Sequence, residues 1–429
     1  MDLFTLTGAS ENVIQLEPRL NGERRTPPPR VYSERTVHGK GIIMRDARES
    51  DTAAIQDLYR VVYHGKYPED FAINPDTLRS EIREFRSSLW LVAEDAATRA
   101  IVGTIVFRVE PDHRIGKAAG VAVLKGYRSA GLASSLLKLG VETLTSPSRG
   151  SLDVDVIYAT TRTITEAPSK VVAEVGFRQM GIFPNAVRVD NLEHLNLDVY
   201  VTDRGLALRR KKPFIYPPLL EVYQIARKEL GLERGRLAAE HPVPVVGSDL
   251  VPLEFSSHQD VAVERYHRLL KEGRLANSFF PFHAPNCLLK SLDGGTEVFV
   301  CFGGVGKQSC IVGYRTDRVN VHSLLNSVAL ELQRAGAGYV ELLVDAHDHQ
   351  LQREAFSARY LPSAYFPALK LNADGLRDDC FVLSRTFYLL DFTGSVLRGN
   401  GLKFLRAYLR YYHDLYIRPI LATDEELIP

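Results

Sequence analysis

Apolar and polar positions along residues 41–205 form a pattern that predicts strands and helices in a definite order. Two strand-like runs, 88–94 and 100–109, flank a polar turn and predict a hairpin. Apolar side chains at helical spacing predict a helix over 132–144, and the run 154–160 predicts the next strand. The expected order is β-α-α-β-β-β-α-β-α-β-β, which is typical of an α/β fold built on a mixed sheet.

The same succession of elements recurs in the second half of the chain. The predicted order over residues 297–385 is strand, strand, helix, strand, helix, strand, strand, and the same order is predicted over residues 100–205. The segment IFPNAVRV at 182–189 can be laid over AYFPALKL at 364–371. We therefore expect an internal repeat.

Changes in composition set the expected domain boundaries. A polar start with three consecutive prolines predicts an extended arm over 1–40, before a first domain over 41–205. A helix and linker are expected over 206–250, and a second domain over 251–390. The remaining residues, 391–429, are expected to carry a C-terminal helix.

Two further segments lead to local expectations. The basic run RRKK at 209–212 is expected to form a solvated face of the linker. Residues 402–416 space their apolar side chains as one helical face. This helix is expected to pack on its own domain, with a surface for a homodimer as the alternative.

Length, composition and charge narrow the class of protein. The chain has 429 residues, of which 45% are hydrophobic and 24% charged, as in ordinary globular proteins of about two to three domains. Lys and Arg total 53 against 52 Asp and Glu, so the net charge of +1 indicates neither a nucleic-acid nor a membrane partner. Without a long apolar run or a signal peptide, the expected location is cytoplasmic.

Cysteine usage predicts no special chemistry. The four cysteines form no CxxC pair and no cluster with histidine at the spacing of metal ligands. We expect buried free thiols and no metal site. The cysteines are Cys287, Cys301, Cys310 and Cys380.

The stretch 120–137 carries the main candidate for chemistry. An apolar strand leads into a loop that contains Gly126, Arg128 and Gly131, and a helix follows directly. Such a loop exposes backbone N–H groups at a helix N-terminus, where they can hold a phosphate or pyrophosphate. Glycine lets the backbone approach the ligand, and Arg128 adds positive charge.

The motif Arg128-x-x-Gly131-x-Ala133, between this strand and this helix, resembles the acetyl-CoA pyrophosphate loop of the GNAT N-acetyltransferase superfamily. The resemblance covers residues 41–205, and it covers the second domain only in topology. It implies two GNAT-like domains, the second degenerate, with acetyl-CoA as co-substrate. The cofactor-binding residues that it implies are Val121, Val123, Gly126, Tyr127, Arg128, Ser129, Gly131, Leu132, Ala133 and Ser134.

The resemblance also implies a mechanism. Backbone amides of the strand before the loop, here those of Val121 and Val123, hold the acyl-CoA and polarise the thioester carbonyl. The acceptor amine attacks directly, helped by a base. Blocks at 162–165, 175–177, 181–185 and 193–197 look similar to bacterial beta-lysine N-acetyltransferase-type members. They imply an amine acceptor and no particular molecule.

This chain departs from the common family pattern at several positions. Val172 stands where many members have a tyrosine that acts as general acid, and Thr165 stands where they often have asparagine. The strand 117–123 lacks the frequent glutamate base. Glu110, at the end of the hairpin strand, and Glu193, in the loop between the last two strands, are the remaining candidate bases.

The remaining sequence evidence concerns the acceptor side of the site and the second domain. Tyr63, His64 and Tyr67 fall in the segment that lines the acceptor side in the family. The second domain has no Arg-x-x-Gly-x-Ala motif before its helix at 322–334. The glycine-rich string at 303–309 is interpreted as a hairpin turn. We expect a single active lobe that acetylates a small amine. The alternative is a catalytically inactive acyl-CoA-binding protein with a regulatory or scaffolding role.

Overall fold

The computed structural model describes residues 30–419, apart from 68, 85, 147–151, 189–190, 240–249, 304–306 and 318–319. Most of the expected N-terminal arm and the last part of the expected linker region, residues 240–249, lie outside the described residues. Within them, no helix is long and apolar enough to cross a membrane.

The first half of the chain has the expected elements in the expected order, preceded by one extra strand. They are β1 (Val31–Val37), β2 (Lys40–Asp46), α1 (Thr52–Tyr63), α2 (Pro75–Arg83), β3 (Ser88–Asp95), β4 (Ile101–Glu110), β5 (Ile115–Val123), α3 (Leu132–Thr145), β6 (Val156–Arg162), α4 (Ala167–Val175), β7 (Arg178–Arg188) and β8 (Leu192–Val201). The expectation of an extended arm up to residue 40 is wrong for β1, which pairs with β2 in an antiparallel hairpin.

A connecting region and the second half follow. The connecting elements are α5 (Asp203–Ala207), β9 (Phe214–Ile215), α6 (Leu220–Leu230) and β10 (Arg236–Leu237). The second half contains β11 (Leu253–Ser256), α7 (Gln259–Lys271), β12 (Cys287–Ser291), β13 (Thr296–Phe302), β14 (Gln308–Thr316), α8 (Val321–Arg334), β15 (Tyr339–Asp345), α9 (His349–Ser357), β16 (Leu361–Leu371), β17 (Arg377–Thr386) and α10 (Gly399–Tyr412). All seven elements expected over 297–385 are confirmed, whereas β11, α7 and β12 were not predicted.

Among the described residues, fifteen strands form one mixed sheet, so the fold is of the mixed α/β class. The strand order is β1-β2-β3-β4-β5-β6-β8-β7-β16-β17-β15-β14-β13-β12-β11. From the centre outward, β7, β8, β6, β5, β4, β3, β2 on one side match β16, β17, β15, β14, β13, β12, β11 on the other. The two halves meet where β7 pairs with β16, with Gly181 opposite Ala364.

Matching irregularities relate the two central hairpins. The β7–β8 ladder shifts register between Gln179 and Gly181, and the β16–β17 ladder shifts between Pro362 and Ala364. Gly181 therefore corresponds to Ala364, which moves the overlay of 182–189 on 364–371 by one residue. The sequence comparison missed this because it gave no sign of where the bulges lie.

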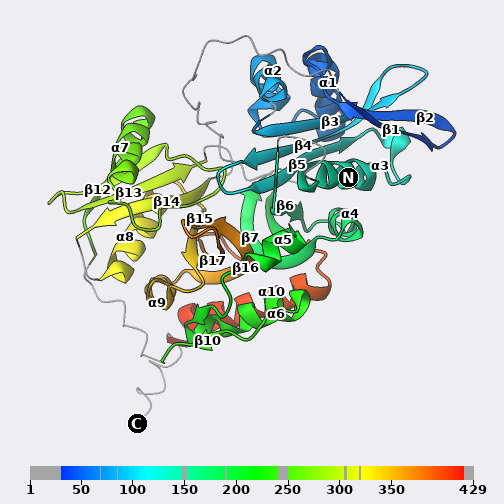
Figure 1. Cartoon of the computed structure of the whole chain (residues 1–429). Coiled ribbons are helices and arrows are strands. Elements are labelled where there is room, and N and C mark those ends of the chain that lie inside the picture. The colour runs from blue at the N-terminus through cyan, green and yellow to red at the C-terminus, as the bar shows by residue number, and fades with distance from the viewer. Residues whose placement is uncertain are drawn as a thin grey trace.

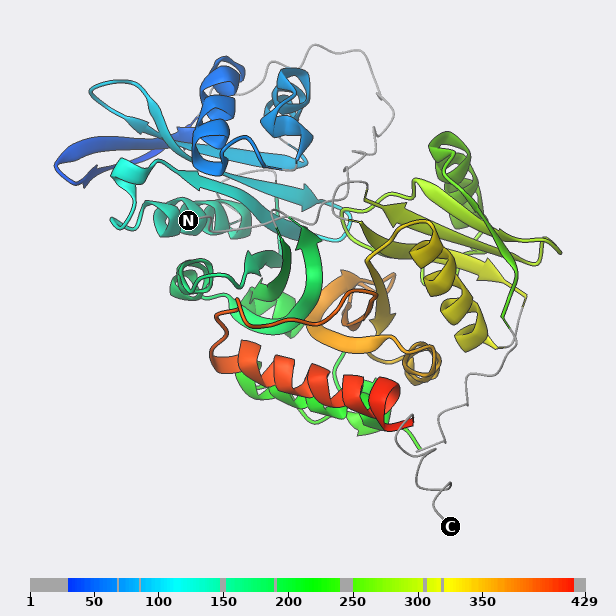
Figure 2. The same cartoon turned by 180° about the vertical axis from the view of Figure 1, so that it is seen from behind.

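Helices cover both faces of the sheet (Figure 1). In the first half α1 contacts β4 and β5, and α3 packs against β3, β4 and β5 from the opposite face. Gly140 in α3 permits this approach, because a Cβ atom there would lie 1.9 Å from the ring of Phe107 in β4. Seen from behind, α6 and α10 lie side by side beneath the centre of the sheet (Figure 2).

Helix α10 binds the two halves together. It contacts both β7 and β16, and also α6. Its side chains Phe404 and Tyr408 are fully buried within the chain. The helix therefore packs on both halves rather than on its own domain alone, and this apolar face is not available to a second copy.

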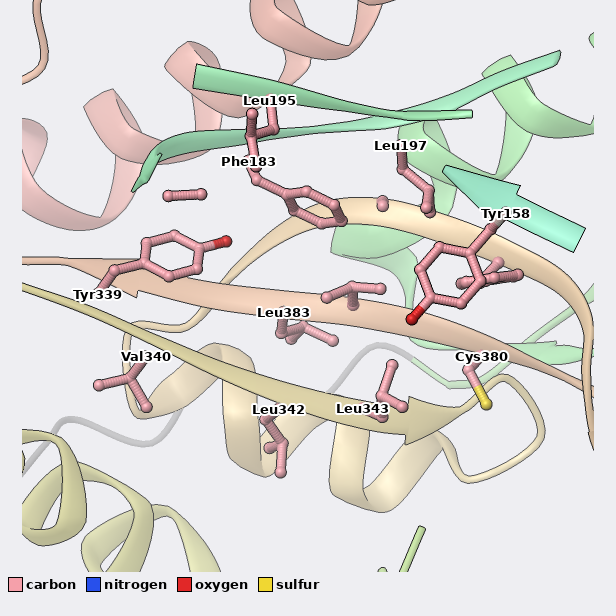
Figure 3. Packing of buried hydrophobic residues seen from close by; sticks show 14 of the residues in the cluster. Tyr158, Phe183, Leu195, Leu197, Tyr339, Val340, Leu342, Leu343, Cys380 and Leu383 are labelled. Atoms are coloured by element: carbon pink, nitrogen blue, oxygen red, sulfur yellow. The ribbon is translucent and has the colours of Figure 1, made fainter. Parts of the chain in front are cut away.

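The main hydrophobic core is continuous across the junction. Figure 3 shows Tyr158 and Phe183 of the first half in the same buried hydrophobic cluster as Tyr339 and Leu383 of the second. The ring centroids of Tyr158 and Phe366 are 5.2 Å apart. The four cysteines are buried thiols, as predicted.

Buried charges also join the halves. Arg377 of β17 is fully buried, and its Nη1 lies 2.9 Å from Oδ2 of Asp155 in the first half. The same side chain donates to the carbonyl oxygens of Ala368 and Leu369 at 2.6 and 3.0 Å. A buried cation needs this degree of pairing, since desolvation alone would oppose its charge.

The basic run at 209–212 was expected to be solvated, and this expectation is wrong for Arg209. Arg209 is buried, and its Nη2 lies 2.7 Å from Oδ2 of Asp379. Arg210 pairs with Asp345 at 3.0 Å. Both acids come from the second half, so these residues connect the linker to the sheet.

Candidate functional site

Strand β5 leaves its regular pairing near its C-terminal end. Val106 of β4 is opposite Ala119, but the next paired residues are Thr104 and Ala122, so Gly120 and Val121 form a bulge. On the other side, β6 pairs with β5 only along Ile115–Lys117. Beyond that point, in strands that are described throughout, the edge of β5 has no strand partner, and backbone groups there can bind a ligand.

The predicted anion loop follows directly. The turn η3 (Lys125–Tyr127) leads to Ser129 and Gly131, whose φ angles are 65° and 70°, and α3 begins at Leu132. Amides in the first turn of a helix have no acceptor within the helix, and the dipole of α3 favours negative charge there. A Cβ atom on Gly126 or Gly131 would meet nothing within 4 Å, so the loop offers space on this side.

Two of the predicted binding side chains are engaged within the protein. The Nε atom of Arg128 donates to the carbonyl oxygen of Val123 at 2.9 Å, which places the guanidinium over the end of β5. Oγ of Ser134 donates to Glu174 of α4 at 2.5 Å. The structure therefore brings the end of β5, the loop and α4 together around the start of α3.

The β1–β2 hairpin adds three basic side chains that the sequence analysis missed. Nη2 of Arg35 donates to the carbonyl oxygen of Ala130 at 2.9 Å. Nε2 of His38 lies 2.9 Å from the carbonyl oxygen of Arg128. No motif marks these residues, since they lie in the segment that was expected to be an extended arm.

The third basic residue, Lys40, contacts Tyr127. Its Nζ donates to the Tyr127 hydroxyl at 3.2 Å and lies 4.4 Å from the centre of the ring. The hydroxyl donates in turn to Asp95 at 2.6 Å, a hydrogen bond that lowers the pKa of this carboxyl to about 2. Tyr127 is thus fixed in the loop by the hairpin on one side and by β3 on the other.

A cluster of tyrosines packs against the bulge from the other face of the sheet. The hydroxyl of Tyr59 donates to the carbonyl oxygen of Gly120, and that of Tyr63 donates to the carbonyl oxygen of Val121 at 2.6 Å. The hydroxyl of Tyr67 is buried and has no hydrogen-bond partner among the described residues. Ring centroids of Tyr63 and Tyr67 are 4.5 Å apart.

The structure thus brings together two of the three residues expected on the acceptor side. Tyr63 and Tyr67 face the bulge, whereas His64 ends α1 with a φ angle of 55° and an exposed side chain. Tyr59 was missed, although it lies four residues before Tyr63 and therefore on the same face of α1.

The two candidate bases lie apart from this cluster or are engaged elsewhere. Glu110 is opposite Ile115 at the start of β5, eight residues before Val123, or about 26 Å at the rise of a strand. Its carboxylate accepts a hydrogen bond from the amide of Phe282 in the second half. Glu110 therefore lies at the far end of β5 from the loop.

Glu193 lies within β8, not in the loop where it was expected. The pairing of β8 with β7 extends past it, since Val187 is opposite Glu193. The carboxylate is buried and forms an ion pair with Arg162 of β6. At the position of the missing general acid, Val172 is buried in the core beneath α3.

The matching helix start in the second half is occupied by the protein itself. The amide of His322, the second residue of α8, donates to Oε2 of Glu354 at 2.9 Å. The same oxygen lies 2.8 Å from Nδ1 of His322. A carboxylate from α9 thus fills the place where the start of α3 offers unpaired amides.

Residues 52–161 match the model of the acetyltransferase (GNAT) family. The chain contains a GNAT acetyltransferase domain. The match runs from the start of α1 almost to the end of β6, so it includes the bulge, the loop and α3. No curated protein matches the chain in sequence.

Several solved acetyltransferases resemble part of the chain. The ribosomal-protein-S5-alanine acetyltransferase of Vibrio fischeri is 17% identical over 38% of this chain and 93% of its own, with a TM-score of 0.33. RimJ of Mycobacterium smegmatis, in complex with CoA-disulfide, is 21% identical over 42% and 89%, with a TM-score of 0.34. NAA60 of Arabidopsis thaliana, in complex with a bisubstrate analogue, is 13% identical over 38% and 98%, with a TM-score of 0.32.

No metal site accompanies the GNAT domain in the described part of the chain, where no three His, Cys, Asp or Glu side chains are grouped to hold an ion.

Proposed function

We propose that this chain transfers an acetyl group from acetyl-CoA to a primary amine of a small or amino-acid-like acceptor. The observation that carries the proposal is the bulge of β5 followed by the open start of α3, inside the segment that matches the GNAT family. In that arrangement, backbone amides of a strand are followed directly by backbone amides at a helix start. The first could bind a thioester and the second a pyrophosphate.

The residues that would hold acetyl-CoA divide into two groups. Amides of Val121 and Val123 would orient the thioester, and amides at the start of α3 would bind the pyrophosphate. Around the second group, Arg128, Arg35 and Lys40 would add positive charge. Acetyl-CoA itself supplies the activated acyl group.

No strong base is needed in this proposal. Glu110 is distant and hydrogen bonded to Phe282, and Glu193 is held in an ion pair with Arg162. An acceptor amine that binds in its neutral form can attack once it is positioned, because orientation alone removes a large part of the barrier. The nitrogen attacks the thioester carbonyl carbon in a ternary complex, and the thiolate of CoA leaves with the proton that the nitrogen releases.

We further propose that the second half is a degenerate copy of the first and binds no acetyl-CoA. The mirrored strand order and the matching bulges support this. Glu354 already fills the start of α8, so an added pyrophosphate would have to displace a hydrogen-bonded carboxylate. Each chain would therefore have one cofactor site.

A second candidate function is an acyl-CoA-binding protein without catalysis, with a regulatory or scaffolding role. Val172 favours it, because this buried apolar side chain stands where a general acid is common. The preserved bulge and the loop favour the transferase instead, since the bulge serves the thioester and a binding protein would need only the loop.

The test is release of free thiol from acetyl-CoA by the full chain with polyamines, diamino acids and peptides with free N-termini. We expect turnover with at least one amine and a product heavier by one acetyl group. Arg128→Glu should abolish it, whereas Lys138→Glu should not, because Lys138 is an exposed residue further along α3. Binding of acetyl-CoA without transfer to any amine would favour the second candidate.

A further inference from the structure

The hydroxyl of Tyr67 is a hydrogen-bond donor that no described residue of the chain uses. Tyr67 is only 5% exposed, and its Oη has no partner among the described residues. A buried hydroxyl without a partner costs about 1–3 kcal/mol in proteins. The hydroxyl of Tyr67 therefore does not itself stabilise the described fold.

The unused hydroxyl lies beside the bulge of β5. A Cβ atom built on Gly120 would be 3.5 Å from Oη of Tyr67. The neighbouring tyrosines are already engaged there, since Tyr59 donates to the carbonyl oxygen of Gly120 and Tyr63 to that of Val121. Tyr67 is thus the member of the cluster whose donor remains available next to the residues that would hold the thioester.

The surroundings of Tyr67 keep its hydroxyl protonated. Its ring packs against Tyr63 at 4.5 Å and against Tyr59 at 4.7 Å between centroids. Burial raises the pKa of Tyr67 well above its usual value, and the nearby Glu69 carboxylate acts in the same direction. The group is therefore suited to donate a hydrogen bond and unsuited to act as a base.

Attack by an amine places negative charge on the thioester oxygen. The C–N bond forms as the carbonyl electron pair moves onto oxygen, and the pair returns as the C–S bond breaks. Donors that are fixed before the reaction stabilise this charge without reorganisation. The backbone amides of the bulge supply such donors, and a side-chain donor would add to them.

We propose that the Tyr67 hydroxyl donates a hydrogen bond to the thioester carbonyl oxygen and stabilises its charge during transfer. This inference rests on the proposed acetyltransferase function. Tyr67 gives up no proton and is unchanged at the end of the reaction. From the sequence, Tyr67 was expected only to line the acceptor side. The proposal makes it a catalytic hydrogen-bond donor.

The variant Tyr67→Phe tests the proposal because it removes one atom and keeps the ring. We expect kcat to fall about 100-fold or more, as when one donor of an oxyanion site is lost. The KM for acetyl-CoA and its Kd from calorimetry should stay within about threefold, because the amides and the loop still bind the cofactor. The melting temperature should stay the same or rise, since a buried unpaired hydroxyl is gone.

Two further variants serve as controls. Tyr63→Phe leaves the carbonyl oxygen of Val121 without its donor, so its melting temperature should fall, opposite to that of Tyr67→Phe. Tyr408→Phe removes a buried hydroxyl from α10, away from the bulge, and should keep the wild-type kcat.

Each other outcome has a definite meaning. A wild-type kcat in Tyr67→Phe overturns this inference and leaves the proposed function standing. Loss of acetyl-CoA binding or a lowered melting temperature in that variant also overturns it, because Tyr67 would then be structural. A wild-type chain that transfers to no amine overturns both the inference and the transferase function on which it rests.

Discussion

Asp198 is an acid buried in the interior of the first half. It lies in β8, and its Oδ2 accepts a hydrogen bond from the hydroxyl of Thr161 at 2.6 Å. Burial raises the pKa of Asp198 to about 7, and the bond from Thr161 acts in the opposite direction. An ordinary Asp has a pKa near 3.9, so the folded chain retains this proton over a range of pH in which the unfolded chain has lost it.

Because of this difference in pKa, the contribution of Asp198 to the free energy of unfolding depends on pH. Between about pH 4 and pH 7 the folded state binds the extra proton, so the contribution of Asp198 to stability falls as pH rises. Asp198→Asn stays neutral and keeps an acceptor for Thr161. We expect its melting temperature to exceed that of the wild type at pH 8, with a gap that shrinks towards pH 5, and a free-energy difference of up to about 4 kcal/mol.

Asp153 provides a control of opposite sign. Its hydrogen bond from Arg204 lowers the pKa of Asp153, so its contribution to stability is present near neutral pH and is lost as pH falls. Asp153→Asn should lower the melting temperature at pH 8 and have less effect at low pH. Melting temperatures measured from about pH 5 to pH 8 for Asp198→Asn, and from about pH 2 to pH 5 for Asp153→Asn, would contradict the account if they ran parallel to those of the wild type.

Single residues also mark the limit of what sequence alone could predict. The run at 209–212 has the composition of a solvated segment, yet Arg209 is buried against Asp379. The pairing acid lies 170 residues further along the chain, and only the folded sheet brings the two together. Glu193 shows the same limit, because its partner Arg162 is supplied by a different strand.

The β1–β2 hairpin is the element that most changes the view of the site. It lies before the segment that matches the GNAT family, and its basic side chains contact three neighbouring residues of the loop, Tyr127, Arg128 and Ala130. Positive charge beside an anion site strengthens binding, and it does so less at high salt.

The double variant His38→Ala, Lys40→Ala tests whether the hairpin contributes to cofactor binding. Both side chains are exposed, so each should contribute less than about 1 kcal/mol. We expect the Kd for acetyl-CoA to rise about threefold to tenfold at low salt and by less at 0.5 M salt. An equal change at both salt concentrations, or no change, would exclude an electrostatic role for the hairpin.

Elements with regular periodicity could be predicted, and irregular ones could not. The order of strands and helices from β2 to β8 follows from apolar spacing, and so does the helix after the loop. The bulge at Gly120 and Val121 depends on pairing with β4, and β1 lies in a polar segment beyond three prolines. The motif 128–133 could be found from sequence because its chemistry is local to one turn.

At the scale of the whole molecule, the two halves are joined where β7 pairs with β16, and the backbones are tightly packed there. Gly181 is opposite Ala364 at the centre of the sheet. A Cβ atom on Gly181 would lie 2.0 Å from Cβ of Ala364 and 2.6 Å from its Cα. Sequence predicted a repeat, but it could not show that the two halves of the chain meet edge to edge or that α10 covers both.

Gly181→Ala should therefore destabilise the entire chain. The clash involves backbone atoms, so β7 and β16 must move apart, and we expect a loss of about 3 kcal/mol or more in the free energy of unfolding. Gly394→Ala is the control, because a Cβ atom there would meet nothing within 4 Å. Urea denaturation that gives both variants the wild-type midpoint would show that the junction is less tight than described.

The central claim is that one acetyl-CoA binds per chain, at the loop between β5 and α3. Calorimetric titration of acetyl-CoA into the full chain, into Arg128→Glu and into Lys138→Glu tests it directly. The account predicts one site per chain, lost in Arg128→Glu and retained in Lys138→Glu. Two sites per chain, or an unchanged affinity in Arg128→Glu, would contradict it.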